Sequence, residues 1–133
     1  MVRGIEKDLL PAAQQYGLGL LPFFPLASGL LTGKYKRGEA APEDTRFGKV
    51  PRLRDQYVTP RNEEIVEKLK LFAEARGHSM LELAFSWLAA RPQVASVIAG
   101  ATKPEQLEQN VRAAAWALTA DDMAAIDKIT RGG

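Results

Sequence analysis

Apolar residues recur at helical spacing in five parts of the chain, and this pattern predicts five helices. The first covers residues 5–16, where Pro11 fits into the first turn if the regular helix begins near Asp8. The other four begin at residues that typically cap helix N-termini: Thr59 followed by Pro60, Ser79 with Glu82, Thr102 with Glu105, and Thr119 with Asp122.

Two short apolar runs, residues 18–24 and 94–99, lack the helical period and are typical of strands buried on both faces. Pro22 suits the end of a strand or a bulge better than a central position. Strands that alternate with helices predict an α/β fold with a parallel sheet. Because a lone parallel pair leaves both edges unpaired, we expect these strands to belong to a larger sheet.

The segment between the first strand and the second helix is polar and irregular. Residues 28–35 form a turn punctuated by glycine, and residues 36–58 show no period. A loop this long in a compact domain is usually a functional lid or a disordered segment. It carries several basic residues, with Arg46 and Phe47 near its middle.

The composition of the chain excludes several classes of protein. The 133 residues suit one domain, and 46% apolar with 26% charged residues is ordinary for a globular protein. A net charge of +2 does not indicate a nucleic-acid or membrane partner. Without cysteine there are no disulfides or thiolate metal sites, and the lone His78 is expected in a turn. No apolar run reaches the roughly 18 residues of a membrane span, and residues 1–8 lack a signal-peptide core, so we expect a cytoplasmic protein.

The first candidate binding site lies at residues 21–29, where the first strand ends. Ligands of parallel α/β folds sit beyond the carboxyl ends of the strands. Ser28 and the backbone around Gly29 could donate hydrogen bonds to a phosphate, and Phe23 or Phe24 could stack on an aromatic ring. The alternative is a pair of core phenylalanines followed by a simple turn.

The second candidate site lies at residues 98–110, where a strand leads directly into a helix. The free N–H groups and the positive dipole at a helix N-terminus attract anions. Thr102 and Lys103 add a hydroxyl and a charge, and a polar face one to two turns further on suits a base or a sugar. That face consists of Gln106, Gln109 and Asn110. The alternative is a capped, solvated helix.

These two motifs resemble one known family. Residues 23–35, Phe-Phe-Pro-Leu-Ala-Ser-Gly-Leu-Leu-Thr-Gly-Lys-Tyr, are similar to the segment after the seventh strand of aldo-keto reductases. Residues 97–110 are similar to the eighth strand and cofactor-binding helix of that family. The resemblance covers nearly the whole chain. It implies the C-terminal part of a (β/α)8 TIM barrel over residues 1–133, with two parallel strands and about five helices, and with residues 36–58 as the loop that covers the cofactor.

The resemblance also implies a chemistry: NADP(H) as cofactor and a small-molecule carbonyl compound as substrate, reduced to an alcohol. Three positions depart from the family pattern, because Phe24 replaces a frequent serine, Gln109 a frequent glutamate and Gln106 a frequent arginine. The cofactor-binding residues that the resemblance implies are Phe23 under the nicotinamide, Pro25, Leu26, Ala27, Ser28 and Gly29 at the pyrophosphate, Lys34 and Arg46 in the covering loop, and Gly100, Thr102, Lys103, Gln106, Gln109 and Asn110 at the adenosine phosphate.

No residue of this chain matches the catalytic Asp, Tyr, Lys and His of the family, which lie on earlier strands. We therefore expect neither catalytic nor metal-binding residues in this chain, and no reductase activity from it alone. Two other functions stay open. The chain could be a non-catalytic cofactor-binding or regulatory module like the potassium-channel β subunits, or a truncated gene remnant; it could also be an unrelated α/β interaction domain. The unpaired strand edges further predict self-association.

Overall fold

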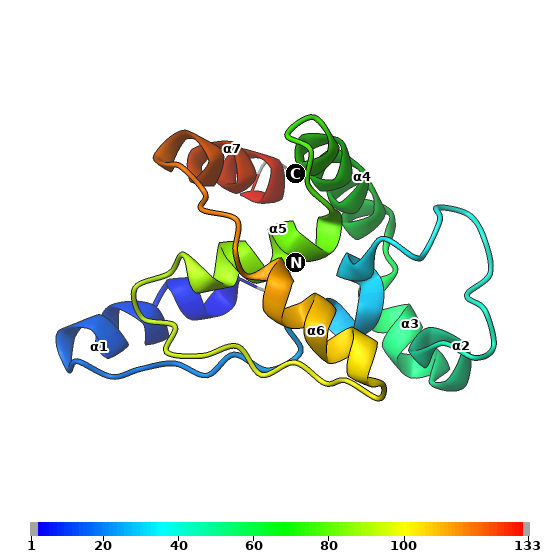
Figure 1. The fold of residues 1–133 in the computed structure, drawn as a ribbon, viewed down its shortest axis with the longest axis horizontal. Coiled ribbons are helices and arrows are strands. Elements are labelled where there is room, and N and C mark those ends of the chain that lie inside the picture. The colour runs from blue at the N-terminus through cyan, green and yellow to red at the C-terminus, as the bar shows by residue number, and fades with distance from the viewer. Residues whose placement is uncertain (1–2, 132–133) are drawn as a thin grey trace.

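The computed structural model describes residues 3–131, in which the regular structure is helical. Figure 1 shows α5 running through the middle of the molecule, and α5 packs against α4, α6 and η2, while α7 lies against α4. In chain order the helices are η1 (Gly4–Glu6, 3₁₀), α1 (Leu9–Gln15), η2 (Ala27–Thr32, 3₁₀), α2 (Arg46–Lys49), α3 (Pro51–Tyr57), α4 (Pro60–Glu74), α5 (Met80–Ala89), α6 (Pro104–Ala113) and α7 (Ala120–Arg131).

Three of the four predicted helix caps are confirmed. Asn62 N–H donates to Thr59 Oγ1 at 3.2 Å at the start of α4. Ser79 and Glu82 form a reciprocal capping box before α5, and Thr119 and Asp122 exchange the same two hydrogen bonds before α7. At its other end, α4 closes with hydrogen bonds of 3.0 Å from Gly77 N–H to the Glu74 carbonyl and from His78 N–H to the Ala73 carbonyl. This cap requires the positive φ of 74° that Gly77 adopts.

The fourth predicted cap, Thr102 with Glu105, is wrong. Helix α6 begins at Pro104, and Lys103 occupies the N-cap position without a capping hydrogen bond from its side chain. Proline fixes φ at a helical value and lacks an N–H, so it favours the first position of the helix and moves the cap one residue along the chain.

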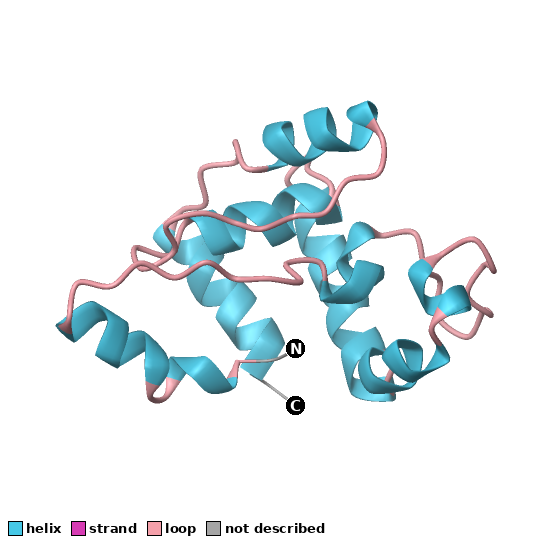
Figure 2. Cartoon of the chain, turned by 90° about the horizontal axis from the view of Figure 1, so that it is seen from below, coloured by secondary structure: helices cyan, strands magenta, loops and turns pink. Residues whose placement is uncertain are grey.

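The two predicted strands are not regular strands within residues 3–131 (Figure 2). Residues 18–24 and 94–99 share one parallel bridge, between Leu20 and Val94. Leu20 N–H donates to the Gln93 carbonyl at 2.7 Å, and Ala95 N–H donates to the Leu20 carbonyl at 3.0 Å. Pro22 has no N–H to extend this ladder. The predicted burial is wrong too, since Leu18 and Leu21 are more than half exposed.

The predicted irregular loop, residues 36–58, contains two short helices, α2 and α3. They have four and seven residues, too few for an apolar period to show in the sequence. Phe47 on α2 is 1% exposed and packs between the rings of Tyr35 and Tyr57, at centroid distances of 4.7 and 6.5 Å. This contact anchors the segment to the body of the molecule.

The buried apolar residues form two clusters. The larger lies between α4, α5 and α7 and contains Ile65, Leu69, Ala73, Met80, Leu83 and Ile126. The smaller contains Ala27, Leu30 and Phe47, and it fixes η2 against α2. This second cluster positions the turn that precedes η2.

Several apolar faces stay uncovered. On the first predicted helix only Ala13 is buried, whereas Ile5, Leu9 and Tyr16 are 46%, 51% and 71% exposed. An apolar cleft of about 480 Å³ lies between α1, residues 20–25 and α5. None of the helices in residues 3–131 combines the length and hydropathy needed to cross a membrane.

Candidate functional site

The turn at residues 23–29 has an unusual backbone. Phe24, Ala27 and Ser28 adopt φ values of 54°, 48° and 58°, in a region that few residues other than glycine occupy. Each such residue costs about 1–3 kcal/mol, and backbone strain of this kind clusters at ligand-binding sites. Hydrogen bonds from Ala27 N–H to the Phe24 carbonyl and from Gly29 N–H to the Leu26 carbonyl hold the turn in place.

Two hydroxyl groups at this turn are buried without a hydrogen-bond partner in the described part of the chain, Ser28 Oγ and Tyr35 Oη. An unpaired buried polar group typically costs about 1–3 kcal/mol. A Cβ placed on Gly29 would lie 3.4 Å from both Tyr35 Oη and Lys34 Cε. The Tyr35 hydroxyl and the Lys34 side chain therefore lie beside Gly29, which follows the buried Ser28 in the chain, and donors of these kinds fit an anion with several oxygen atoms.

An aromatic pair precedes the hydroxyl groups. The Phe23 and Phe24 rings lie 5.1 Å apart, and the Arg46 guanidinium lies over Phe24 at 5.0 Å. Phe23 is 71% exposed, so its ring is open to stacking by a planar group. Residues 34–58 contain seven basic and four acidic side chains, an excess of positive charge that favours an anionic ligand.

The second predicted site, at the start of α6, is occupied by its own side chain. The N–H and the hydroxyl of Thr102 both donate to Gln106 Oε1, at 2.8 and 3.1 Å. A neutral carbonyl oxygen thus takes the position in which an anionic oxygen would accept both hydrogen bonds. Lys103 lies exposed in the same turn.

The remaining predicted residues lie near these two groups. Pro25 and Leu26 are half-buried in the first turn, and Ala27 is buried. Gly100 and Gln109 are exposed and Asn110 is half-buried, before and along α6. Within residues 3–131 no hydrogen bond or ion pair joins the two groups. Figures 1 and 2 agree that the N-terminal end of α6 lies toward the end of the molecule that carries α2 and α3.

The lone histidine, His78, lies in the turn after α4, as predicted. It stacks on Trp116 at 4.0 Å, and its Nδ1 lies 3.0 Å from Glu82 Oε1. The Ser79 backbone N–H, followed by His78 and the Ser79 hydroxyl, lowers the pKa of Glu82 to about 2. No cluster of three potential metal ligands occurs in the described residues.

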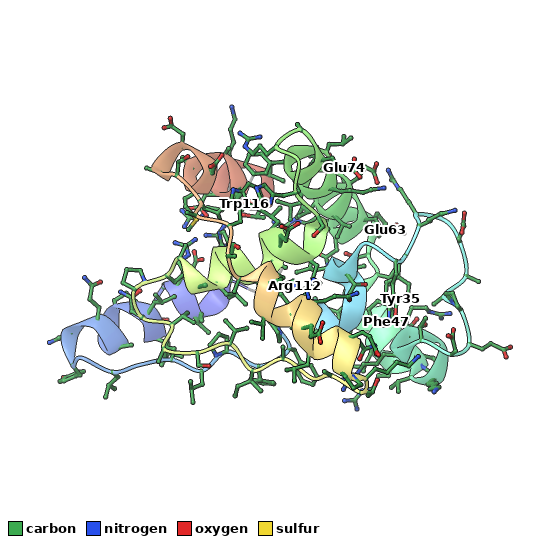
Figure 3. All side chains as sticks on the ribbon, viewed as in Figure 1. Tyr35, Phe47, Glu63, Glu74, Arg112 and Trp116 are labelled. Carbon is green, nitrogen blue, oxygen red and sulfur yellow. The ribbon has the colours of Figure 1, made fainter. Side chains whose placement is uncertain are left out.

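Tyr35 is the residue that the sequence patterns missed. Only the fold brings its hydroxyl to Gly29, because Phe47, twelve positions along the chain, sets the direction of its ring. Figure 3 shows Tyr35 and Phe47 side by side between η2 and the 36–58 segment. Of the residues predicted from the sequence, Lys34 lies beside Gly29 and Ser28 is buried in the same turn.

The chain is similar to proteins of one known family. Residues 1–131 match the sequence profile of the Aldo/keto reductase family. An L-glyceraldehyde 3-phosphate reductase of Escherichia coli is 43% identical over 116 residues, which are 84% of this chain and 33% of that protein. A rice protein named as a probable voltage-gated potassium channel subunit beta is 41% identical over 111 residues, 82% of this chain and 34% of its own.

A solved structure is similar as well. A glycerol dehydrogenase from Gluconobacter oxydans superposes with a TM-score of 0.76 at 31% identity, over 96% of this chain and 38% of its own. The chain spans about one third of the length of the curated relatives it matches.

Proposed function

This chain belongs to the aldo/keto reductase family, and we propose that it forms the NADP(H)-binding part of a barrel that reduces carbonyl compounds to alcohols. One observation carries the proposal: the buried Ser28 hydroxyl, without a partner in residues 3–131, at a strained turn beside Lys34. Oxygen-rich anions such as a pyrophosphate satisfy hydroxyl and ammonium donors of this kind.

NADPH supplies the hydride in this chemistry. The exposed ring of Phe23 would lie against the nicotinamide, and Ser28 and Lys34 would hold the pyrophosphate. Arg46 reaches the same turn from the 36–58 segment, which Phe47 fixes against the core, so this segment covers the cofactor and excludes water. The turn itself consists of Pro25, Leu26, Ala27, Ser28 and Gly29.

The start of α6 binds the adenosine phosphate in this proposal. The N–H and hydroxyl of Thr102, which donate to Gln106 Oε1 in this structure, would hold the phosphate. Lys103 places a positive charge in the same turn and favours the 2′-phosphate that distinguishes NADPH from NADH. Gly100 leaves room for the backbone to approach, and Gln109 and Asn110 lie further along the cofactor side of the helix.

Carbonyl reduction further requires a proton donor within hydrogen-bond reach of the developing alkoxide. The tyrosines of this chain do not supply it: Tyr16 is 71% exposed at the end of α1, and Tyr35 and Tyr57 pack on either side of Phe47. We therefore place the catalytic Asp, Tyr, Lys and His on the part of the barrel that this chain does not span. The chain alone binds the cofactor without turnover.

A second function is a non-catalytic, cofactor-sensing subunit. Relatives from rice and Arabidopsis thaliana that are 41% and 38% identical are named as probable channel β subunits. Both functions use the same cofactor site, so cofactor binding does not separate them. Carbonyl reduction by the intact barrel does, because a sensing subunit requires no turnover.

Cofactor binding is tested directly by titrating the purified chain with NADPH and following the fluorescence of the nicotinamide. We expect a saturable change that Lys34→Glu weakens about ten-fold or more, because a charge that attracts the pyrophosphate becomes repulsive. Lys128→Glu, a charge reversal at another exposed lysine, on α7, is the matched control and leaves binding unchanged. Absence of saturable binding by the wild-type chain contradicts the proposed function.

A further inference from the structure

We propose that the Tyr35 hydroxyl is a ligand of the dinucleotide pyrophosphate, and that Lys34 covers this hydroxyl until the anion arrives. The inference rests on the proposed function. It adds a binding residue that neither the sequence patterns nor the names of the relatives assign.

The position of the Tyr35 hydroxyl is set by packing. The Tyr35 ring lies 4.7 Å from the ring of Phe47, the most deeply buried aromatic of the 36–58 segment (Figure 3). The hydroxyl is buried and has no hydrogen-bond partner in residues 3–131. A phenylalanine would pack against Phe47 in the same way without burying an unpaired polar atom. The hydroxyl therefore contributes to the chain only when an acceptor oxygen enters the turn.

Gly29 opens the space in front of this hydroxyl. Its φ of 104° disfavours any residue with a side chain, and a Cβ there would touch Tyr35 Oη at 3.4 Å. Ser28, which is 6% exposed, places a second unpaired hydroxyl in the preceding residue. Two unpaired hydroxyl donors, at Ser28 and Tyr35, near a glycine that carries no side chain match the several oxygens of a phosphoryl group.

Lys34 covers the site. Its ammonium group lies over the Tyr35 ring, 5.2 Å from the ring centroid, and its Cε occupies the same space beside Gly29. The Lys34 side chain is exposed, and a lysine stem has several rotatable bonds, so it can move without disturbing the core. A phosphate competes with the aromatic ring for the ammonium group, draws it aside and uncovers the hydroxyl. The three groups then bind the same anion.

The variant Tyr35→Phe tests this role, because it removes one oxygen atom and keeps the packing on Phe47. We expect NADPH affinity to fall about ten-fold or more, the usual effect of losing a hydrogen bond to a charged group. Without ligand, the denaturant midpoint of the variant should equal or exceed that of the wild type, since an unpaired buried hydroxyl is gone. Tyr57→Phe, on the other side of Phe47, is the matched control and should leave NADPH affinity unchanged.

Inorganic pyrophosphate and inorganic phosphate serve as further probes. We expect pyrophosphate to bind more tightly than phosphate and to lose affinity in Tyr35→Phe. Equal NADPH affinity of wild type and Tyr35→Phe overturns the inference and leaves the proposed function standing. Destabilisation of the ligand-free variant overturns it as well, because the hydroxyl then has a structural partner. If the wild type binds pyrophosphate but no dinucleotide, the proposed function fails, and the pyrophosphate affinity of Tyr35→Phe still decides the role of Tyr35. Binding of neither probe refutes both.

Discussion

Three non-glycine residues, Phe24, Ala27 and Ser28, adopt left-handed backbone conformations within one turn. The sequence identifies Ser28 and Gly29 as candidate phosphate ligands, but it does not reveal the strain, since glycine and asparagine are the usual signals of positive φ. The fold sustains the strain because Ala27 and Leu30 pack on Phe47. The strain of this turn thus costs local stability, as expected of a ligand-binding turn.

We expect Lys103 to set the preference between NADPH and NADH. Lys103→Glu reverses the exposed charge at the start of α6, and we expect NADPH affinity to fall more than NADH affinity, because only NADPH carries the 2′-phosphate. Competitive titration with the two dinucleotides measures the ratio. An equal loss for both would remove the assignment of the 2′-phosphate to this turn.

Capping residues are the elements of structure that the sequence predicts best. Thr59, Ser79 and Thr119 form the expected caps because each needs only its own backbone and a residue three positions away. Thr102 fails because Pro104 moves the helix start and Gln106 takes the hydrogen bonds instead. A helix cap can therefore be predicted from the sequence when no neighbouring side chain competes for the same N–H donor.

The Ser79–Glu82 cap should make stability depend on pH. The pKa of Glu82 is lowered from its ordinary 4.5 to about 2, chiefly by the Ser79 backbone N–H. A lowered folded-state pKa gives stability that is complete above about pH 4.5 and is lost as the pH falls toward about 2. Urea titrations of wild type and Glu82→Gln should differ by about 1 kcal/mol near neutral pH, the usual size of a cap. The difference should vanish near pH 2; a constant difference would show that the charge of Glu82 plays no part.

The two short helices of the 36–58 segment cannot be predicted from hydrophobic periodicity. Helices of four and seven residues contain too few apolar positions to show a helical period, and a single aromatic residue among charged ones gives no pattern. Phe47 nevertheless fixes the segment, because its ring lies between Tyr35 and Tyr57. Contacts distant in sequence decide the structure of this element.

Phe47→Ala should release the segment. Removing a buried phenylalanine typically costs about 3–5 kcal/mol, and here the loss should appear first as rapid tryptic cleavage at the basic residues of 36–58. Val50→Ala, at a position 41% exposed in the same segment, is the control and should resist cleavage like the wild type. Unchanged cleavage of Phe47→Ala would mean that other contacts hold the segment.

At the scale of the whole molecule, the sequence predicts the family and the order of elements more securely than the sheet. Residues 18–24 and 94–99 have the composition of central strands, yet they share one bridge and leave Leu18, Leu21 and Ile98 exposed. A sheet forms by pairing with neighbours, and the chain spans about one third of its curated relatives. The apolar composition of these segments suits burial inside a complete sheet. Two segments that pair only with each other do not provide that burial.

We expect the isolated chain to self-associate through these uncovered apolar residues. Sedimentation velocity over a range of concentrations should show reversible association that the double variant Leu18→Glu, Leu21→Glu reduces. The control is the same double change on the exposed face of α6, Leu107→Glu with Val111→Glu. It shows whether association depends on residues 18–21 or on exposed apolar side chains in general. A stable monomer with a sharp two-state unfolding transition would be incompatible with this expectation.

The central claim is that this chain holds the cofactor site of a reductase without its catalytic groups, and one measurement tests it most directly. Purified chain saturated with NADPH is mixed with reactive aldehydes, and the near-ultraviolet absorbance of NADPH is followed. We predict no oxidation above that of free NADPH, because loss of a positioned acid alone removes about 10²–10⁴-fold in rate. Turnover at ordinary enzyme rates, about 1–10³ per second, that survives removal of host reductases would contradict the claim, and its loss in Tyr57→Phe would identify Tyr57 as the proton donor.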